Sequence, residues 1–279
     1  IYPDAEEFLT RSLDREGVVR RMATIRKNPA EHPLRETLLP GATLLPYQLD
    51  GIAFAVGAGR AILADDMGLG KTIQGVGVAE MLAREANITR VLVVCPASLK
   101  SQWAAEITRF SGRSSQLILG KNSERAEQYR SDAFFTICNY EQVLRDQIVI
   151  EPVPWDLIIL DEGQRIKNWE AKTSSVIKAL RSPYALVLSG TPLENRLDEL
   201  FSVMEFIDDR RLGAAFRFYN QHRTTDEKGK VLGYKNLTQL RKRLRPALLR
   251  RTRASLRDLP PLLLKRRDPT MRFVFSREP

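Results

Sequence analysis

Short apolar runs alternate with longer amphipathic stretches between residues 61 and 189. The apolar runs contain no charged residue, which is typical of strands buried on both faces of a parallel sheet. They occupy residues 61–64, 91–95, 116–119, 133–138, 157–160 and 185–188. The stretches with helical spacing lie between them, at residues 73–85, 99–110, 123–130 and 173–180. This alternation predicts an α/β fold with a doubly wound parallel sheet flanked by helices.

The pattern differs on both sides of this region. The N-terminal residues have helical spacing and many charges, and they end near two Pro residues, so we expect a helical lead-in. Helical spacing returns at residues 195–207 and in two stretches within 212–257, split by the polar turn 224–230, which predicts a helical appendage without strands. The predicted organisation is a lead-in over residues 1–35, an α/β lobe over 36–207, a basic helical protrusion over 208–260 and a tail over 261–279.

A glycine-rich loop with the sequence DDMGLGKT follows the first apolar run, at residues 65–72. After a buried strand, such glycines let consecutive N–H groups point at phosphate oxygens beside a helix N-terminus. Lys71 would then meet the terminal phosphates and Thr72 would ligate magnesium. Asp65 stands where the usual phosphate-loop pattern has its first glycine, so a glycine-rich turn closing an ordinary strand is the alternative.

Two acids, Asp161 and Glu162, end the apolar run 157–160. Ligands of open α/β sheets bind at the carboxyl ends of the strands, so these acids and the glycine-rich loop are expected to share one crevice. One carboxylate could hold the magnesium that bridges nucleotide phosphates, and its neighbour could polarise the attacking water. Paired acids are also common in ordinary turns, but that alternative loses weight beside the phosphate loop.

The chain has 279 residues, which is enough for one large α/β core with an appendage, and its formal net charge is +10. This basic balance favours a polyanionic partner over a membrane or an acidic protein. Eight of the cations cluster near the C-terminus: Arg241, Lys242, Arg243, Arg245, Arg250, Arg251, Arg253 and Arg257. A solvated helix face is the alternative explanation for that cluster.

The remaining composition excludes several classes of site. Cys95 and Cys138 each end an apolar run, so we expect buried thiols in a reducing compartment. His32 and His222 lack metal-ligand spacing, and we predict no zinc site. The sequence has neither a long apolar span nor a signal-peptide layout, which predicts a soluble intracellular protein without a membrane partner. Because the chain does not begin with Met, we expect it to be a piece of something longer.

Five short sequence blocks stand in a fixed order along the chain. They are LPYQLDG at 45–51, DDMGLGKT at 65–72, VCPASL at 94–99, DEGQRIKN at 161–168 and LSGTPLEN at 188–195. Together they resemble the SWI/SNF-like branch of the superfamily 2 helicase-type ATPases, which typically has an acid at the position of Asp65. Residues 248–261 also resemble the segment that comes after the first lobe in that family. The resemblance implies that residues 36–207 form a RecA-like, ATP-binding lobe on a P-loop parallel sheet.

The resemblance also implies roles toward ATP and Mg²⁺. Gln48 is similar to the family's adenine-recognising glutamine, and Ser189 and Thr191 to the motif that couples hydrolysis to nucleic-acid contact. Gln164 stands where the family usually has histidine, and we expect activity to survive that change because its amide can still form hydrogen bonds. The implied nucleotide site is Gln48, Asp66, Met67, Gly68, Leu69, Gly70, Lys71 and Thr72, with Thr72 and Asp161 on the metal and Lys71, Asp161, Glu162 and Gln164 as catalytic residues.

Nucleic-acid contacts are implied for loop residues that the family places along the sugar-phosphate backbone. They are Ser98, Lys100, Asn139, Tyr140, Arg165, Lys167 and Asn168. Hydroxyls, amides and cations at such positions suit phosphate contacts and carry no sequence code. The implied partner is double-stranded DNA, and the implied location is the nucleoid and cytoplasm or the nucleus, depending on the source.

Motors of this type close two RecA-like lobes on one nucleotide, and an arginine from the second lobe raises the rate about a thousandfold or more. No second set of alternating strands comes after residue 192, so we expect the second lobe to lie in a longer chain and this part to hydrolyse ATP slowly. Residues 239–243 resemble a fragment of the arginine motif, but their helical position argues against a finger. The alternatives are a lobe of an RNA helicase and a catalytically silent nucleic-acid-binding module; no oligomer is predicted.

Overall fold

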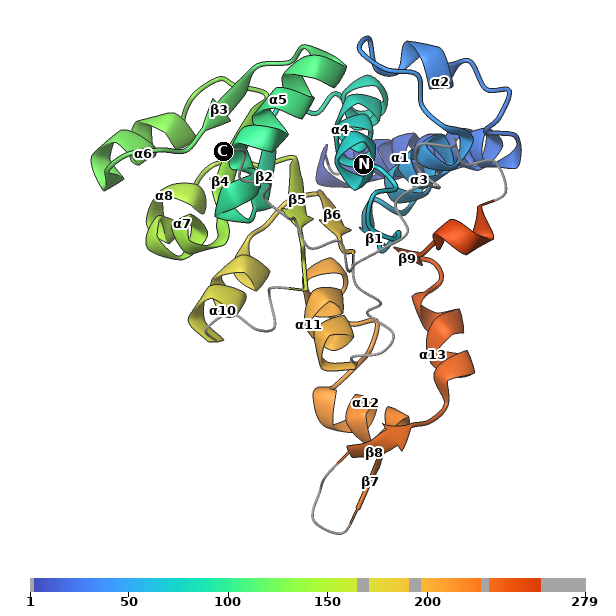
Figure 1. Cartoon of the computed structure of the whole chain (residues 1–279). Coiled ribbons are helices and arrows are strands. Elements are labelled where there is room, and N and C mark those ends of the chain that lie inside the picture. Colours follow the sequence, from blue (N-terminus) through green and yellow to red (C-terminus); the bar gives the residue numbers. More distant parts are fainter. Residues whose placement is uncertain (1–2, 165–170, 191–196, 227–230, 257–279) are drawn as a thin grey trace, which may run out of the picture.

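The computed structural model describes residues 3–164, 171–190, 197–226 and 231–256, and a seven-stranded sheet forms its centre (Figure 1). The strands lie in the order β3, β4, β2, β5, β6, β1, β9. Their bounds are β1 Arg60–Leu63, β2 Val91–Cys95, β3 Ser115–Leu117, β4 Phe135–Asn139, β5 Leu157–Asp161, β6 Tyr184–Leu188 and β9 Leu248–Leu249. Every neighbouring pair is parallel, which confirms the predicted sheet.

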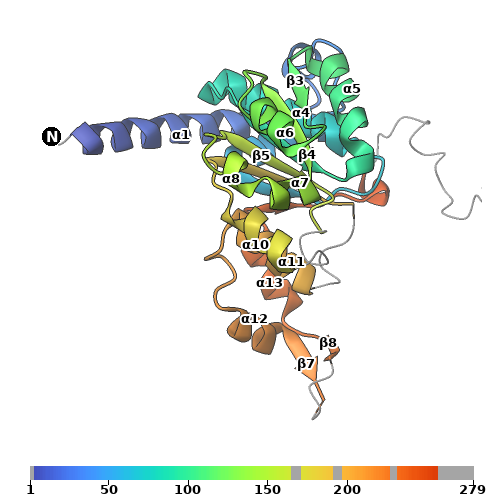
Figure 2. The same cartoon turned by 90° about the vertical axis from the view of Figure 1, so that its left-hand side faces the viewer.

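Alternate strand residues pack into two hydrophobic cores, one on each face of the sheet. Leu63 and Ile159 belong to the first core, whereas Ile62 and Leu160 belong to the second. The first face carries α1 Pro3–Lys27, α3 Pro46–Ala58, α4 Lys71–Ala86 and α5 Lys100–Ser111. The second carries α6 Asn122–Tyr129, α7 Tyr140–Arg145, α8 Gln147–Ile150, α10 Ala171–Ala179 and α11 Leu197–Ile207. Figure 2 shows α4 and α5 above the strands and α10 and α11 below.

The predicted helix of the lead-in is present as α1, and the short helix α2 (Leu34–Thr37) comes after it. Val18, Met22 and Ile25 of α1 are buried in the first core, where α1 packs against α3. The lead-in therefore contributes to the packing of the lobe. Within the described residues, no helix is both long and apolar enough to cross a membrane.

The expectation of an appendage without strands is wrong. Between α12 (Ala215–His222) and α13 (Leu237–Leu244) the chain forms an antiparallel hairpin of β7 (Arg223–Thr225) and β8 (Val231–Tyr234). Both strands are rich in β-branched or aromatic residues, which suit an extended backbone. The polar stretch 224–230 was interpreted from the sequence as a break between two helices, but its first two residues, Thr224 and Thr225, belong to β7 and pair with β8.

The last predicted helix is also shorter than expected. α13 ends at Leu244, since Pro246 lacks the N–H that a continuing helix needs. The chain then returns to the lobe as the edge strand β9, which pairs with β1, and ends in the one-turn helix η3 (Arg253–Ser255). Residues 247–256 thus lie against the predicted ATP-binding lobe and not on the protrusion.

Candidate nucleotide site

The phosphate loop and the acid pair lie at the same edge of the sheet. Leu188 at the end of β6 is in register with both Leu63 of β1 and Asp161 of β5. Neighbouring strands are about 4.8 Å apart, so the starts of the two loops are separated by roughly 10 Å. Polar groups on both loops can therefore reach one ligand, as the sequence predicted.

The loop itself depends on two glycines in the left-handed region, Gly68 with φ 81° and Gly70 with φ 75°. Gly70 is the N-cap of α4, so the backbone turns directly into the helix N-terminus. A Cβ atom on Gly70 would lie 2.6 Å from Nε2 of Gln48. The conformation and the space both exclude a side chain here, and the loop can present N–H groups to an anion.

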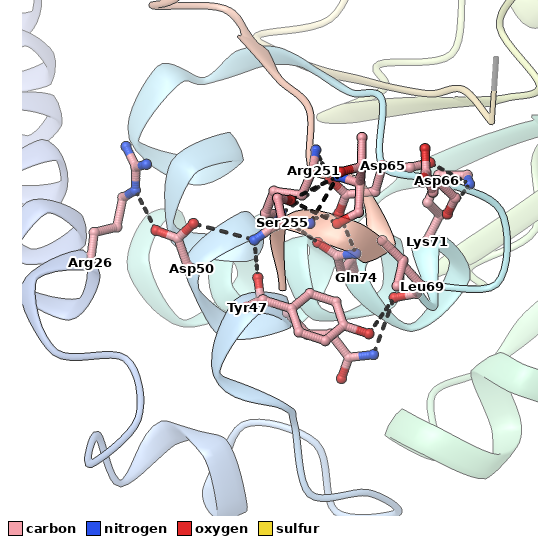
Figure 3. Close-up of polar contacts among 12 residues, drawn as sticks. Arg26, Tyr47, Asp50, Asp65, Asp66, Leu69, Lys71, Gln74, Arg251 and Ser255 are labelled. Atoms are coloured by element: carbon pink, nitrogen blue, oxygen red, sulfur yellow. Dashed lines mark hydrogen bonds and ion pairs between the residues drawn. The ribbon is translucent and has the colours of Figure 1, made fainter. Parts of the chain in front are cut away.

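Lys71 begins α4, and its ammonium group is held inside the loop (Figure 3). Nζ donates to the carbonyl oxygens of Asp65 at 2.9 Å and Asp66 at 3.3 Å. Burial lowers the pKa of Lys71, while the nearby carboxylates of Glu162, Asp65 and Asp161 act in the opposite direction. The acid pair at the end of β5 and the lysine of the loop therefore share one electrostatic environment.

The carboxylate of Asp161 is buried and oriented by two N–H groups. Nε1 of Trp103 donates to Oδ2 at 2.9 Å, and the backbone N–H of Glu162 donates to Oδ1 at 2.9 Å. The Tyr140 hydroxyl donates to the Asp161 carbonyl at 2.6 Å and fixes the backbone. Burial raises the pKa of Asp161, whereas the Trp103 hydrogen bond lowers it. The carboxylate keeps lone pairs that a cation could use.

Glu162 has a φ of 52°, a left-handed conformation that is uncommon outside glycine and that clusters at functional sites. Its Oε2 accepts a hydrogen bond from Nε2 of Gln164. Oε1 of Gln164 in turn accepts from the Ser189 hydroxyl at 2.9 Å. The glutamine that replaces the family's usual histidine thus links Glu162 to the Ser189 turn after β6.

Gln48, the predicted adenine-recognising residue, is buried beside the loop. Its Oε1 accepts from the backbone N–H of Leu45 at 3.0 Å, and its Nε2 donates to the Leu69 carbonyl at 3.4 Å. The Tyr47 hydroxyl donates to the same carbonyl at 3.0 Å. These hydrogen bonds hold the N-terminus of α3 against the phosphate loop. A contact between Gln48 and the adenine base stays a prediction.

A family model described as the SNF2-related domain matches residues 47–269. The chain belongs to the SNF2-related family. It is 30% identical over 252 residues to the CHD3-type chromatin-remodeling factor PICKLE of Arabidopsis thaliana and 33% identical over 227 residues to the ISWI chromatin-remodeling complex ATPase ISW1 of Saccharomyces cerevisiae. These matches cover 78% and 76% of this chain but 18% and 20% of the relatives.

Comparison of the fold with solved structures supports the same family. The structure of the Sulfolobus solfataricus SWI2/SNF2 ATPase core in complex with dsDNA matches with a TM-score of 0.69 at 33% identity, over 79% of this chain and 47% of that one. The SNF2-related chain is thus a first RecA-like lobe, and the predicted resemblance is confirmed. It spans about a fifth of the length of these two curated relatives.

The nucleic-acid residues predicted for this SNF2-related lobe differ in exposure. Ser98 is exposed after β2, and Asn139 at the end of β4 caps α7 by accepting from the Gln142 backbone N–H at 2.8 Å. Lys100 and Tyr140 are buried, and the Lys100 ammonium donates to the Ile118 carbonyl. The structure thus places these two inside the protein. Arg165, Lys167, Asn168 and Thr191 lie outside the described residues.

Two residues that contact the site, Trp103 and Arg251, were missed as site residues. A buried indole requires an acceptor for its N–H, and Trp103 lies on a predicted helix next to the sheet edge. An acid in place of the loop's first glycine requires a cationic partner, which Arg251 provides. Both residue types were visible in the sequence, but their partners are 58 and 186 residues away.

The donor set suits Mg²⁺ bound together with a nucleotide. Magnesium usually takes one or two protein ligands and completes its shell with phosphate oxygens and water. Thr72, half-buried in the first turn of α4, and Asp161 at the end of β5 would supply them. The described residues contain no group of three or more His, Cys, Asp or Glu that could hold a metal alone.

Proposed function

We propose that this lobe binds Mg-ATP and the backbone of duplex DNA, as the first half of an ATP-driven DNA translocase or remodeller. The observation that carries the proposal is the common sheet edge, where Lys71, Asp161 and Glu162 share one electrostatic environment. Membership of a family of ATPase cores supports the reaction type, and hydrolysis by this chain is part of the proposal.

Each side chain has a defined task in this proposal. Lys71 exchanges its two loop carbonyls for phosphate oxygens, and the loop N–H groups and the α4 N-terminus stabilise the remaining negative charge. Thr72 and Asp161 would hold Mg²⁺, which neutralises charge on the phosphates. Glu162, oriented through Gln164, positions the attacking water and accepts its proton. Ser189 donates a hydrogen bond to Gln164, so a movement of the Gln164 side chain would be transmitted to the turn after β6.

Duplex DNA is the nucleic acid that we favour. The formal net charge of +10 suits a polyanion, and Ser98 is exposed at the same sheet edge as the nucleotide site. The matched Sulfolobus structure is a complex with dsDNA, and relatives include the ATP-dependent DNA helicase DDM1 of Arabidopsis thaliana. Binding through phosphates predicts sequence-independent affinity that falls with salt. Arg165, Lys167 and Asn168 are proposed contacts because they match the family's loop positions.

Hydrolysis by this chain alone is expected to be slow. The chain covers 47% of the matched ATPase core, and an arginine supplied from elsewhere in such motors is worth about 10³-fold or more in rate. Steady-state ATP turnover with and without duplex DNA tests this, with Glu162→Gln as the control that retains the binding residues. Turnover near background in both conditions is expected, and robust DNA-stimulated turnover by this chain would contradict the need for a second lobe. Weaker binding of structured RNA than of duplex DNA would argue against the alternative that this is a lobe of an RNA helicase.

A further inference from the structure

Arg251, in the segment after β9, forms hydrogen bonds with Asp65, the first residue of the phosphate loop (Figure 3). Its Nη2 donates to Oδ2 of Asp65 at 2.6 Å, and its Nε donates to Oδ1 at 3.1 Å. The backbone N–H of Arg251 also donates to Oδ1 at 3.1 Å. The Asp65 carboxylate is fully buried and the Arg251 side chain is 11% exposed. This is a bidentate pair with a third, backbone, hydrogen bond.

The same guanidinium also reaches both helices that flank the loop. Nη2 donates to Oε1 of Gln74 in α4 at 3.0 Å, and Gln74 donates through Nε2 to Oδ2 of Asp65 at 3.1 Å. Nη1 donates to Oδ2 of Asp50 in α3 at 3.2 Å and to the Tyr47 carbonyl. Arg251 therefore ties the loop, α3 and α4 together at one point.

The backbone continues this contact along the loop. Asp66 donates through its backbone N–H to the Arg251 carbonyl at 3.0 Å, which extends the pairing between β1 and β9 by one more step. Arg253 donates through its backbone N–H to Oδ2 of Asp66 at 3.1 Å and through Nη2 to the Met67 carbonyl at 2.6 Å. Three consecutive loop residues, 65 to 67, are thus held by the segment after β9.

We infer that Arg251 is a positioning residue for the phosphate loop. The Asp65 and Asp66 carbonyls that hold the Lys71 ammonium belong to the two residues that Arg251 fixes. The carboxylate that replaces the loop's usual glycine is fully buried, and a buried carboxylate without a cationic partner is strongly unfavourable. The loop therefore keeps its phosphate-binding shape only while Arg251 is in place. This inference rests on the proposed nucleotide site.

A purely structural role for the pair is the competing explanation, and the chain contains a matched control. Arg125 and Asp146 form another bidentate pair, with Nε–Oδ2 and Nη2–Oδ1 distances of 2.7 and 2.5 Å. Their side chains are 12% and 1% exposed, nearly the same as in the Arg251–Asp65 pair. This pair joins α6 to the junction of α7 and α8, away from the loop.

The test compares Arg251→Gln, Arg251→Lys and Arg125→Gln with the unchanged chain. Urea unfolding measures stability, and a fluorescent ATP analogue with Mg²⁺ measures the dissociation constant under conditions where each variant is folded. Both Gln variants should lose stability, but only Arg251→Gln should weaken nucleotide binding, by tenfold or more, and Arg251→Lys should restore part of it. If Arg251→Gln does not fold, the double variant Asp65→Asn, Arg251→Gln, which removes the unpaired charge, should fold and still bind weakly.

The outcomes separate the two proposals. An unchanged dissociation constant in the Arg251 variants, beside normal binding by the unchanged chain, overturns the positioning role and leaves the nucleotide site intact. Equal weakening by Arg125→Gln also overturns it, because loss of stability would then explain the effect. No nucleotide binding by the unchanged chain overturns the proposed function itself, together with the inference that rests on it.

Discussion

Replacing Trp103 by phenylalanine removes the side-chain donor that the structure places on the buried Asp161 carboxylate. Trp103 is 1% exposed, and its Nε1 lies 2.9 Å from Oδ2. Phenylalanine keeps an aromatic ring in α5 but has no N–H, so Oδ2 loses this partner. The ring is also smaller and leaves a cavity beside Gly75, where an added Cβ atom would be 3.0 Å from the indole.

The expected loss combines two effects. A hydrogen bond to a charged group contributes about 1.5–3 kcal/mol, and shrinking a buried side chain costs about 1 kcal/mol more. Trp103→Phe should therefore lower the free energy of unfolding by about 2.5–4 kcal/mol, a large share of the roughly 5–15 kcal/mol typical of a domain. Nucleotide binding that requires ionised Asp161 should weaken as well.

The loss should depend on pH in a defined direction. The Trp103 hydrogen bond lowers the pKa of Asp161, so removing it raises that pKa beyond the increase that burial already causes. The folded variant then takes up a proton at higher pH than the folded wild type. Its deficit in unfolding free energy is largest above this raised pKa and shrinks as the pH falls through it.

Urea unfolding at a series of pH values from about 8 down to about 5 measures this deficit. Trp155→Phe is the matched control, because Trp155 is 4% exposed and its Nε1 donates to the neutral Ile150 carbonyl at 3.1 Å. Its cost should not change with pH. A Trp103→Phe deficit that is equally independent of pH would refute the role of this hydrogen bond in holding Asp161 ionised.

Three further predictions concern the same sheet edge and the two thiols. Asp161→Asn should destabilise the unliganded protein by about 1–3 kcal/mol in thermal or urea unfolding, since its one amide oxygen can accept from only one of the two N–H groups that bond to Asp161, and its NH2 group would face the other donor; unchanged or higher stability would contradict this. Gly163→Ala should destabilise by about 1–3 kcal/mol, because the new Cβ would lie 2.2 Å from Cγ1 of Val187; unchanged urea unfolding would count against that packing. Cys95 and Cys138 should not react with Ellman's reagent until urea unfolds the chain, since burial raises the pKa of both thiols, that of Cys138 to about 12; a fast-reacting thiol in the native protein would show that the core is open.

The sequence predicted the sheet well because its central strands are continuous apolar runs between helical stretches. β9 was missed because two leucines are too short to form a pattern, and its strand character comes from pairing with β1. α3 carried no amphipathic stripe because its central residues are buried, so its apolar residues surround the helix. Such elements are defined by their tertiary neighbours more than by local periodicity.

The site was predictable where chemistry follows the chain locally. Lys71 lies in the glycine-rich loop, and Asp161 ends a continuous apolar run; both patterns are recognisable in the sequence. Because the carboxyl ends of parallel strands meet at one edge of the sheet, the two residues were expected to lie close together. Trp103 and Arg251 gave no local signal, because their contacts with Asp161 and Asp65 form only when the chain folds. The contribution of Arg165 and Thr191, which lie outside the described residues, stays a prediction.

The most direct test of the nucleotide site is calorimetric titration of ATP, in magnesium and in EDTA, into the unchanged chain, Lys71→Ala and Asp161→Asn. Lys71 would contact phosphate directly, whereas Asp161 would act through the metal. Lys71→Ala should therefore weaken binding in both conditions, and Asp161→Asn only in magnesium. Equal affinities of all three proteins for ATP in magnesium would contradict a magnesium nucleotide held between the phosphate loop and the acid pair at the end of β5.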